Sequence, residues 1–191
     1  MNRSTVNQVI KEAISMFSNN GWHLPPEPKW DVTDFGLNDF ISFGLVLVNL
    51  AEEAEYCEKL MYAKKGMTTP CHAHKMKKED IIVRNGKLAI QIWKGRPGDD
   101  KIGDPFEIKI NGHFNKIYSG DILKLSAGER VTLVPGIYHE FYPLSEECII
   151  GEVSSANDDE HDNYFINENI GRFSEIIEDE PPIVKLVNDP A

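Results

Sequence analysis

The sequence predicts an all-β protein, an antiparallel barrel or jelly-roll sandwich, preceded by a helical arm. Short runs that alternate apolar and polar residues follow one another from about Phe43 to Val153. Glycine, asparagine, proline and aspartate separate these runs, as in proteins built from many short strands. The N-terminal residues instead carry apolar side chains at spacings of three and four, which is typical of one amphipathic helix.

The N-terminal arm is predicted from an apolar stripe. Its members are Val6, Val9, Ile10, Ala13, Ile14 and Phe17. Ser4 is the predicted N-cap and Gly21 the predicted stop. The stretch WHLPPEPKWDVTDFG follows, and we expect an ordered irregular segment because its tryptophans would be unfavourable in water. The expected division is an arm, residues 1–42, packed on a barrel with an acidic C-terminal segment, residues 43–191, in one structural domain. The stripe must pack on the barrel or on a second subunit.

The predicted strands are short and rich in β-branched residues. They are FGLVLVNLA, YCEKLMYA, DIIVRNG, KLAIQIW, FEIKI, DILKLSAG, ERVTLVP and ECIIGEV. Asn85-Gly86, between two of these runs, predicts a tight hairpin. After Val153 the sequence becomes irregular and acidic.

Composition and charge exclude some classes of partner. The formal net charge is −11, which disfavours nucleic acid and anionic membrane surfaces. No apolar run approaches the roughly 20 residues that a membrane-spanning helix needs. The N-terminus lacks the features of a secretory signal, and the 3 cysteines fit no zinc pattern, so we expect free thiols in the cytoplasm.

The stretch GMTTPCHAHKMKKEDIIVRNG contains two histidines one residue apart, His72 and His74. Residues i and i+2 of a strand point to the same face, so both imidazoles would project into one side of the barrel. Glu79 begins the next run, and a hairpin would fold it back beside them. His139, in VPGIYHEFY, is the fourth candidate. Nitrogen and oxygen ligands of this kind suit Mn, Fe, Co, Ni or Zn, so these residues are the predicted metal ligands.

These motifs carry a family resemblance. The string from Gly66 to Gly86 reads Gly-x5-His-x-His-x4-Glu-x6-Gly and resembles the first motif of the cupin family. The string GERVTLVPGIYH resembles the second, although Pro135 directly precedes its glycine and Pro143 replaces its final asparagine. HAHKMKKEDIIVRNGKLAIQIW, VPGIYHEFY and GEVSSANDDEHDNYF together resemble the D-lyxose isomerases, which are cupin sugar isomerases, and the similarity covers nearly the whole chain.

The resemblance implies a fold and an activity. The fold would be the cupin double-stranded β-helix, or jelly-roll barrel. The reaction would interconvert D-lyxose and D-xylulose, and also D-mannose and D-fructose, by proton transfer through a cis-enediolate. The expected cofactor is Mn²⁺, with Co²⁺, Fe²⁺, Ni²⁺ or Zn²⁺ as alternatives, and it would act as a Lewis acid. The expected assembly is a homodimer, and the only expected ligand is a small sugar.

The resemblance also suggests roles for further residues. Lys77 would be the acid at the sugar oxygens, because the family carries a lysine at this place. Glu168 would be the base, because the family carries a glutamate four places before the arginine of its Gly-Arg-Phe. Asp158 and Asp162 are candidates for binding sugar hydroxyls, the alternative being a solvated acidic loop. Glu152 alternates with an apolar run and is predicted to point into the barrel as a substrate-binding residue.

Other functions fit the same motifs. An iron-dependent cupin dioxygenase can use the same ligands and would require O₂. A cupin sugar-phosphate isomerase would act only on phosphorylated substrates, but the sequence shows no cluster of arginine or lysine at the presumed site mouth. A non-catalytic sugar-binding cupin would bind without turnover.

Overall fold

The protein is described here from a computed structural model, which describes residues 1–99, 103–155, 161–171 and 174–189. The helices are α1 (Arg3–Asn19) and α2 (Phe40–Phe43). The strands are β1 (Lys29–Thr33), β2 (Leu45–Glu52), β3 (Tyr56–Lys64), β4 (Thr69–His74), β5 (Glu79–Asn85), β6 (Lys87–Trp93), β7 (Pro105–Ile110), β8 (His113–Tyr118), β9 (Ile122–Ser126), β10 (Arg130–Leu133), β11 (Tyr138–Pro143), β12 (Glu147–Ser155) and β13 (Asn163–Phe165).

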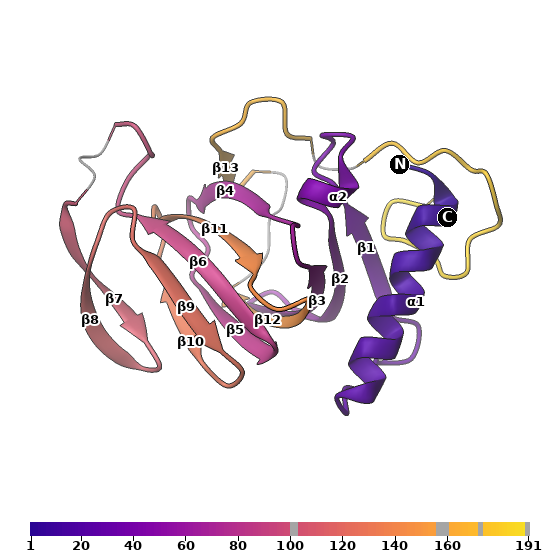
Figure 1. The fold of residues 1–191 in the computed structure, drawn as a ribbon, viewed down its shortest axis with the longest axis horizontal. Coiled ribbons are helices and arrows are strands. Elements are labelled where there is room, and N and C mark those ends of the chain that lie inside the picture. The colour runs from indigo at the N-terminus through magenta and orange to yellow at the C-terminus, as the bar shows by residue number, and fades with distance from the viewer. Residues whose placement is uncertain (100–102, 156–160, 172–173, 190–191) are drawn as a thin grey trace.

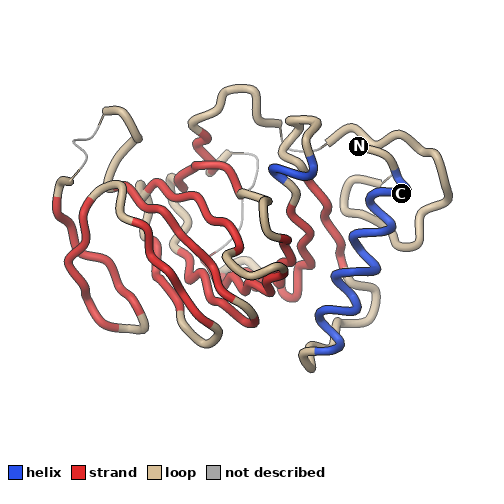
Figure 2. The backbone as a smooth tube through the Cα atoms, viewed as in Figure 1, coloured by secondary structure: helices blue, strands red, loops and turns tan. Residues whose placement is uncertain are grey.

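The strands form two antiparallel sheets that face each other (Figures 1 and 2). The larger sheet has the order β1-β2-β3-β12-β5-β10-β7-β8, and the smaller has the order β13-β4-β11-β6-β9. Consecutive strands such as β4, β5 and β6 therefore lie alternately in the two sheets. The predicted all-β class with an N-terminal helix is confirmed.

The main hydrophobic core fills the space between the sheets. Strand alternation supplies it: in β5, Glu79, Ile81 and Val83 are buried, while the residues between them are partly exposed. Ile90 of β6 and Phe141 of β11 approach the same core from the smaller sheet. The inward positions of β5 are therefore apolar, with Glu79 as the polar exception at its start.

Helix α1 covers the outer face of the larger sheet. All of its stripe except the exposed Ile14 packs against Val46, Val48, Leu60 and Tyr62 of β2 and β3 in a second buried cluster. β3 is consequently buried on both faces, with Met61 in the core between the sheets and Leu60 under the helix. The stripe finds its partner within one chain, so it gives no argument for a second subunit.

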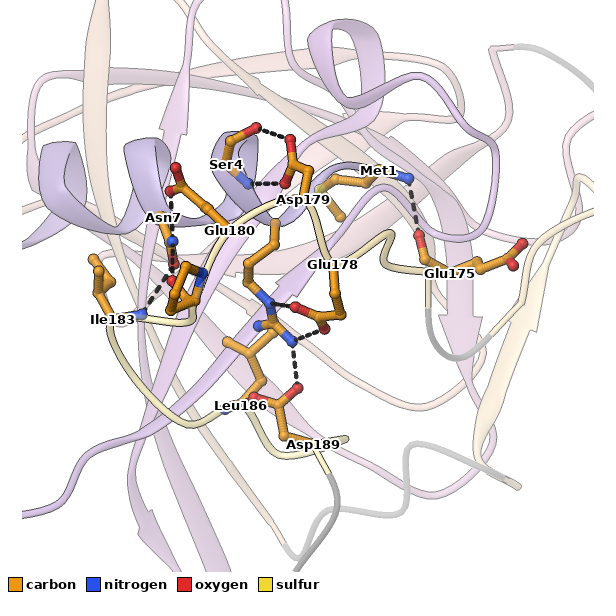
Figure 3. Close-up of polar contacts among 12 residues, drawn as sticks. Met1, Ser4, Asn7, Glu175, Glu178, Asp179, Glu180, Ile183, Leu186 and Asp189 are labelled. Carbon is orange, nitrogen blue, oxygen red and sulfur yellow. Dashed lines mark hydrogen bonds and ion pairs between the residues drawn. The ribbon is translucent and has the colours of Figure 1, made fainter.

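The C-terminal segment runs back over the start of α1 (Figure 3). Asn2, not Ser4, is the N-cap, and the Asn2 side chain makes no capping hydrogen bond. The carboxylate of Asp179 instead accepts hydrogen bonds from Ser4 N–H at 2.8 Å and Ser4 Oγ at 2.6 Å. The predicted cap at Ser4 is therefore wrong, because a carboxylate distant in the sequence neutralises this helix end.

Arg3 lies beneath this segment and is almost fully buried. Its guanidinium donates to Glu178 at 2.6 and 2.8 Å and to Asp189 at 2.7 Å. The N-terminal ammonium of Met1 donates to the carbonyl of Glu175 at 2.8 Å (Figure 3). Both ends of the described chain are thereby attached to the helical side of the molecule, away from β7 and β8 (Figure 1).

Two local predictions differ from the structure. The predicted irregular segment contains β1, which pairs with β2 along its whole length. Asn85-Gly86 does not close a hydrogen-bonded hairpin, because β5 pairs with β10 and β12 whereas β6 pairs with β9 and β11. The turn instead carries the chain from one sheet to the other. Gly86 has φ +86°, and a Cβ there would lie 2.7 Å from the carbonyl oxygen of Glu147.

No described helix has the length and apolar character that a membrane crossing requires.

Candidate metal centre

Adjacent strands of the smaller sheet place three imidazoles together. His72 and His74 lie on the inner face of β4, and His139 of β11 stands directly opposite His72 in the strand pairing. The ring centroids of His72 and His139 are 4.2 Å apart. One ring nitrogen from each of the three histidines lies within 4.8 Å of the others, and all three residues are buried.

Glu79 reaches these imidazoles from the opposite sheet. Its Oε1 lies 3.2 Å from Nε2 of His74 and 3.1 Å from Nε2 of His139. The expected hairpin does not bring it there, because β4 and β5 belong to different sheets. Residues 75–78 instead cross between the sheets, and the inward position of Glu79 at the start of β5 turns its carboxylate toward the histidines.

The donor atoms fit a divalent metal ion. Among the described residues, Nε2 of His74, Nε2 of His139 and Oε1 of Glu79 are buried without a hydrogen-bond partner. Such orphaned atoms are rare in folded proteins unless a ligand satisfies them. Ligands at about 2.1 Å from a metal and at right angles to each other lie about 3 Å apart, which is close to the distances between these atoms.

The protonation of the histidines favours the same use. Nδ1 of His72 lies 2.8 Å from the carbonyl oxygen of Pro70, and Nδ1 of His139 lies 3.2 Å from that of Ile137. Each Nδ1 therefore donates to a carbonyl oxygen, and Nε2 is the nitrogen left to bind a metal. Burial, together with the charges of His139 and His74, lowers the pKa of His72 well below its ordinary value, so this imidazole is neutral, as a metal ligand must be.

A buried ion cluster extends from the metal centre toward the larger sheet. Nζ of Lys77 lies 3.2 Å from Oε2 of Glu79 and 2.9 Å from Oε1 of Glu152. Burial acts to raise the pKa of Glu79, but Lys77 and His74 outweigh it and hold that pKa well below its usual range. Burial likewise acts to raise the pKa of Glu152, and Lys59 and Lys77 together lower it. Both carboxylates are therefore ionised at neutral pH.

Lys59 is a site residue that the sequence reasoning missed. It is buried on β3 and stands opposite Glu152 of β12 in the strand pairing. A signal was present, since Lys59 occupies an inward position between Cys57 and Met61 in a run otherwise rich in apolar residues. A lysine at such a position must have an anionic neighbour, because an isolated buried charge is very unfavourable.

These groups line one cavity of about 90 Å³ between the sheets. Its polar lining includes the three histidines, Glu79, Lys77, Lys59 and Glu152. Its apolar lining includes Phe35, Leu47, Met61 and Phe165. A cavity with a few converging polar groups and an apolar wall is the usual form of a small-molecule site.

The remaining predicted residues lie elsewhere. Glu168 is exposed in the loop after β13, and the described residues that line the cavity include Glu152 but not Glu168. Asp162 is buried beside the cavity, and its carboxylate accepts hydrogen bonds from the backbone N–H groups of Met76 and Lys77. Asp158 lies outside the described residues.

Two facing antiparallel sheets with this histidine-rich cavity between them define a cupin with a candidate metal centre. Solved structures share the fold. The L-ribose isomerase of Cellulomonas parahominis, with L-ribose, superposes with a TM-score of 0.70 at 18% identity, covering 93% of this chain and 98% of that one. The L-ribose isomerase of Acinetobacter sp. DL28, in complex with L-ribose, gives a TM-score of 0.69 at 14% identity, with coverage of 93% and 98%.

Sequence comparisons identify the family to which the chain belongs. The family model for D-lyxose isomerase matches residues 27–190. A D-lyxose/D-mannose isomerase of Escherichia coli O157:H7 is 33% identical over 223 aligned positions, covering 99% of this chain and 98% of that protein. One from Serratia proteamaculans is 33% identical over 216 positions, with coverage of 95% and 94%. The chain belongs to the D-lyxose isomerase family.

Proposed function

We propose that the protein is a metal-dependent aldose–ketose isomerase that interconverts D-lyxose and D-xylulose, and also D-mannose and D-fructose. Family membership supports the reaction, and the names of the bacterial relatives support both sugar pairs. The observation that carries the proposal is that one buried cavity unites the four candidate metal ligands with an ionised carboxylate and an ammonium group. Aldose–ketose isomerisation needs these groups and no oxidant.

Glu152 is the proposed base, in place of Glu168. The reaction moves one proton between C1 and C2 of the sugar, so a carboxylate must lie at the cavity and be ionised. Glu152 meets both conditions, because it lines the cavity and its pKa is lowered by Lys59 and Lys77 against the effect of burial. In the aldose-to-ketose direction Glu152 would take the proton from C2, and the same carboxylic acid would return it to C1.

Lys77 is the proposed group at the sugar oxygens. As the C2 proton leaves, negative charge grows on the two oxygens of the cis-enediolate, and one proton must pass from O2 to O1. The Lys77 ammonium, between Glu79 and Glu152, can donate hydrogen bonds to these oxygens and balance their charge. Lys59, opposite Glu152, would keep that carboxylate ionised when Lys77 turns toward the sugar.

His72, His74, Glu79 and His139 are the residues that would hold the metal, and Mn²⁺ is the proposed ion. When bound, a divalent metal would supply Lewis-acid stabilisation of the charge on the sugar oxygens. Nitrogen and carboxylate ligands are compatible with Mn²⁺, and also with Fe²⁺, Co²⁺, Ni²⁺ or Zn²⁺. A free sugar is the proposed substrate because both lysines of the cavity lie beside the Glu152 carboxylate, which reduces their attraction for a phosphate group.

Assembly and location are further parts of the proposal. A homodimer is proposed from the family resemblance, since the apolar stripe of α1, except Ile14, is already buried within the chain. A cytoplasmic location is supported by the free thiols of Cys57, Cys71 and Cys148. Sedimentation of the purified protein would test the dimer.

A metal-exchange assay tests the activity. The protein is stripped with chelator, loaded separately with Mn²⁺, Fe²⁺, Co²⁺ or Zn²⁺, and followed for conversion of D-lyxose to D-xylulose under nitrogen. We expect turnover with Mn²⁺, none without metal, and none in His72→Ala. Turnover that requires both Fe²⁺ and O₂ would identify a dioxygenase instead. Activity confined to phosphorylated sugars would identify a sugar-phosphate isomerase, and sugar binding without turnover would identify a binding protein.

A further inference from the structure

The three histidines of the metal centre are not held in the same way. His72 and His139 each place Nδ1 against the carbonyl oxygen of the residue two positions earlier in the chain, at 2.8 and 3.2 Å. His74 has no such local partner. Its Nδ1 is buried and makes no hydrogen bond to any residue that the structure describes. If His74 holds a metal through Nε2, which faces Glu79, its proton would lie on Nδ1 and would need an acceptor.

The carboxylate of Asp162 faces this nitrogen, with Oδ2 3.8 Å from Nδ1 of His74. Asp162 directly precedes β13, which pairs with β4 so that Asn163 stands opposite His74. The side chain of Asp162 is buried and does not line the cavity. Its position is thus fixed by the edge strand of the smaller sheet, immediately behind the metal centre.

The same carboxylate fixes the connection that carries Lys77. Oδ1 accepts from the N–H of Met76 at 2.6 Å, and Oδ2 accepts from the N–H of Lys77 at 2.9 Å. The backbone carbonyl of Asp162 accepts from the N–H of Lys75 at 2.9 Å. One residue therefore anchors three successive amides of the segment that crosses between the sheets.

We infer that Asp162 is a positioning residue that aligns His74 as a metal ligand and Lys77 as the acid, and that it does not bind the sugar. A small movement of the ring toward Oδ2 on metal binding would form a carboxylate–histidine–metal arrangement. Such an arrangement fixes the ring orientation and makes the ligand nitrogen more basic. The inference rests on the metal site of the proposed function, and it replaces the substrate-binding role that the sequence predicted for Asp162.

The test is the variant Asp162→Asn in the full chain. The amide keeps the shape of the carboxylate but puts an NH₂ or a neutral oxygen opposite His74 and Lys77. We expect the affinity of the chelator-stripped protein for Mn²⁺, measured by calorimetric titration, to fall about 10- to 100-fold. At saturating Mn²⁺ we expect kcat to fall while KM for D-lyxose stays at its wild-type value.

The matched control is Asp179→Asn. Asp179 also accepts hydrogen bonds from a backbone N–H and a side chain, but on the exposed start of α1. Its Mn²⁺ affinity should equal that of the wild type. If Asp162→Asn binds Mn²⁺ with the affinity of the wild type, the inference is overturned. A raised KM for D-lyxose would then identify Asp162 as a sugar ligand, and unchanged constants would show that it has neither role.

Two further readouts keep the inference testable. If Asp162→Asn does not fold, long-range ¹H–¹⁵N NMR of the wild type with bound Zn²⁺ tests the hydrogen bond directly. We expect the Nδ1–H of His74 to be hydrogen-bonded and protected from exchange. A rapidly exchanging Nδ1–H would contradict the inference. If the wild type isomerises no sugar, the proposed function fails, yet the Mn²⁺ titrations of both variants still support or refute the role of Asp162.

Discussion

Nζ of Lys77 lies 2.9 Å from Oε1 of Glu152 and 3.2 Å from Oε2 of Glu79, so one ammonium joins two carboxylates of different roles. Glu79 faces the histidines of the metal centre, and Glu152 is the proposed base. The two carboxylates lie on adjacent strands of the larger sheet, whereas Lys77 comes from the segment that enters from the smaller one. Charge at the metal centre and charge at the base are therefore coupled through a single side chain.

Replacing Glu152 tests which carboxylate moves the proton. Glu152→Gln should lower kcat by about 10²- to 10⁴-fold, because the amide cannot accept a proton from carbon. Mn²⁺ should still bind, because Glu152 is not one of the four candidate metal ligands. Glu168→Gln is the matched control and should keep the wild-type kcat, since Glu168 is exposed. An inactive Glu168→Gln beside an active Glu152→Gln would restore the assignment predicted from the sequence.

Replacing Lys77 tests the coupling of the two carboxylates. Lys77→Met leaves Glu79 and Glu152 buried without the cation between them, and the metal-free protein should lose about 3–5 kcal/mol of unfolding free energy. Bound metal should recover part of this loss because it compensates Glu79. Urea unfolding with and without Mn²⁺ measures both effects. Lys78→Met removes an exposed lysine next in the chain and should change neither value; an equal loss in that variant would contradict the explanation.

Acid should destabilise the metal-free protein through Glu152. The folded-state pKa of this group is lowered, so the unfolded chain binds more protons below about pH 4.3, the ordinary glutamate pKa. The stabilising contribution is complete above that pH and is lost as pH falls through the folded pKa. Urea unfolding over a series of acidic pH values should therefore show a shallower decline in Glu152→Gln than in the wild type. Parallel curves for the two proteins would refute this contribution.

Removal of the metal should lower thermal stability. A ligand present at a thousandfold excess over its Kd stabilises the folded state by about 4 kcal/mol, provided that it does not bind the unfolded chain. Melting temperature should therefore fall on addition of chelator and rise with Mn²⁺. The Mn²⁺ effect should disappear in His139→Ala and persist in His113→Ala, which changes an exposed residue of β8. Persistence in both variants would show that the ion binds elsewhere.

The buried guanidinium under the C-terminal segment should contribute measurably to stability. The Arg3 side chain is 3% exposed and pairs with Glu178 and with Asp189, which are 55% and 15% exposed. Arg3→Met should cost about 1–3 kcal/mol, less than a fully buried pair because solvent reaches Glu178. Lys29→Met, which breaks an exposed pair with Glu52, should cost under about 1 kcal/mol. Equal costs measured by urea unfolding would contradict the difference in burial.

Three ligands of the candidate metal centre, His72, His74 and Glu79, could be predicted from the sequence because the information for them is local. His72 and His74 share a face through strand alternation alone, and Glu79 follows at a spacing that belongs to a known motif. The apolar stripe of α1 is equally local, and the helix forms where the stripe predicts it.

The remaining features depend on contacts between distant segments. Alternation with an apolar run predicted the inward position of Glu152, but its place beside Lys59 and Lys77 depends on the pairing of β12 with β3 and β5. Asn85-Gly86 provides the turn, but the partners of the flanking strands decide that it joins two sheets. Asp179 reaches Ser4 only because the C-terminal segment returns to the start of α1.

The crossing of the chain between two sheets has a consequence for folding. Of the four candidate ligands, an unfolded chain holds only the two histidines of β4 close together. His139 is distant in the sequence, and Glu79 turns toward the histidines only when both sheets have closed. Closing such long loops is an entropically costly and slow part of folding. We therefore expect a metal ion to find all four candidate ligands only in molecules whose two sheets have closed, so that its binding would report completion of the barrel.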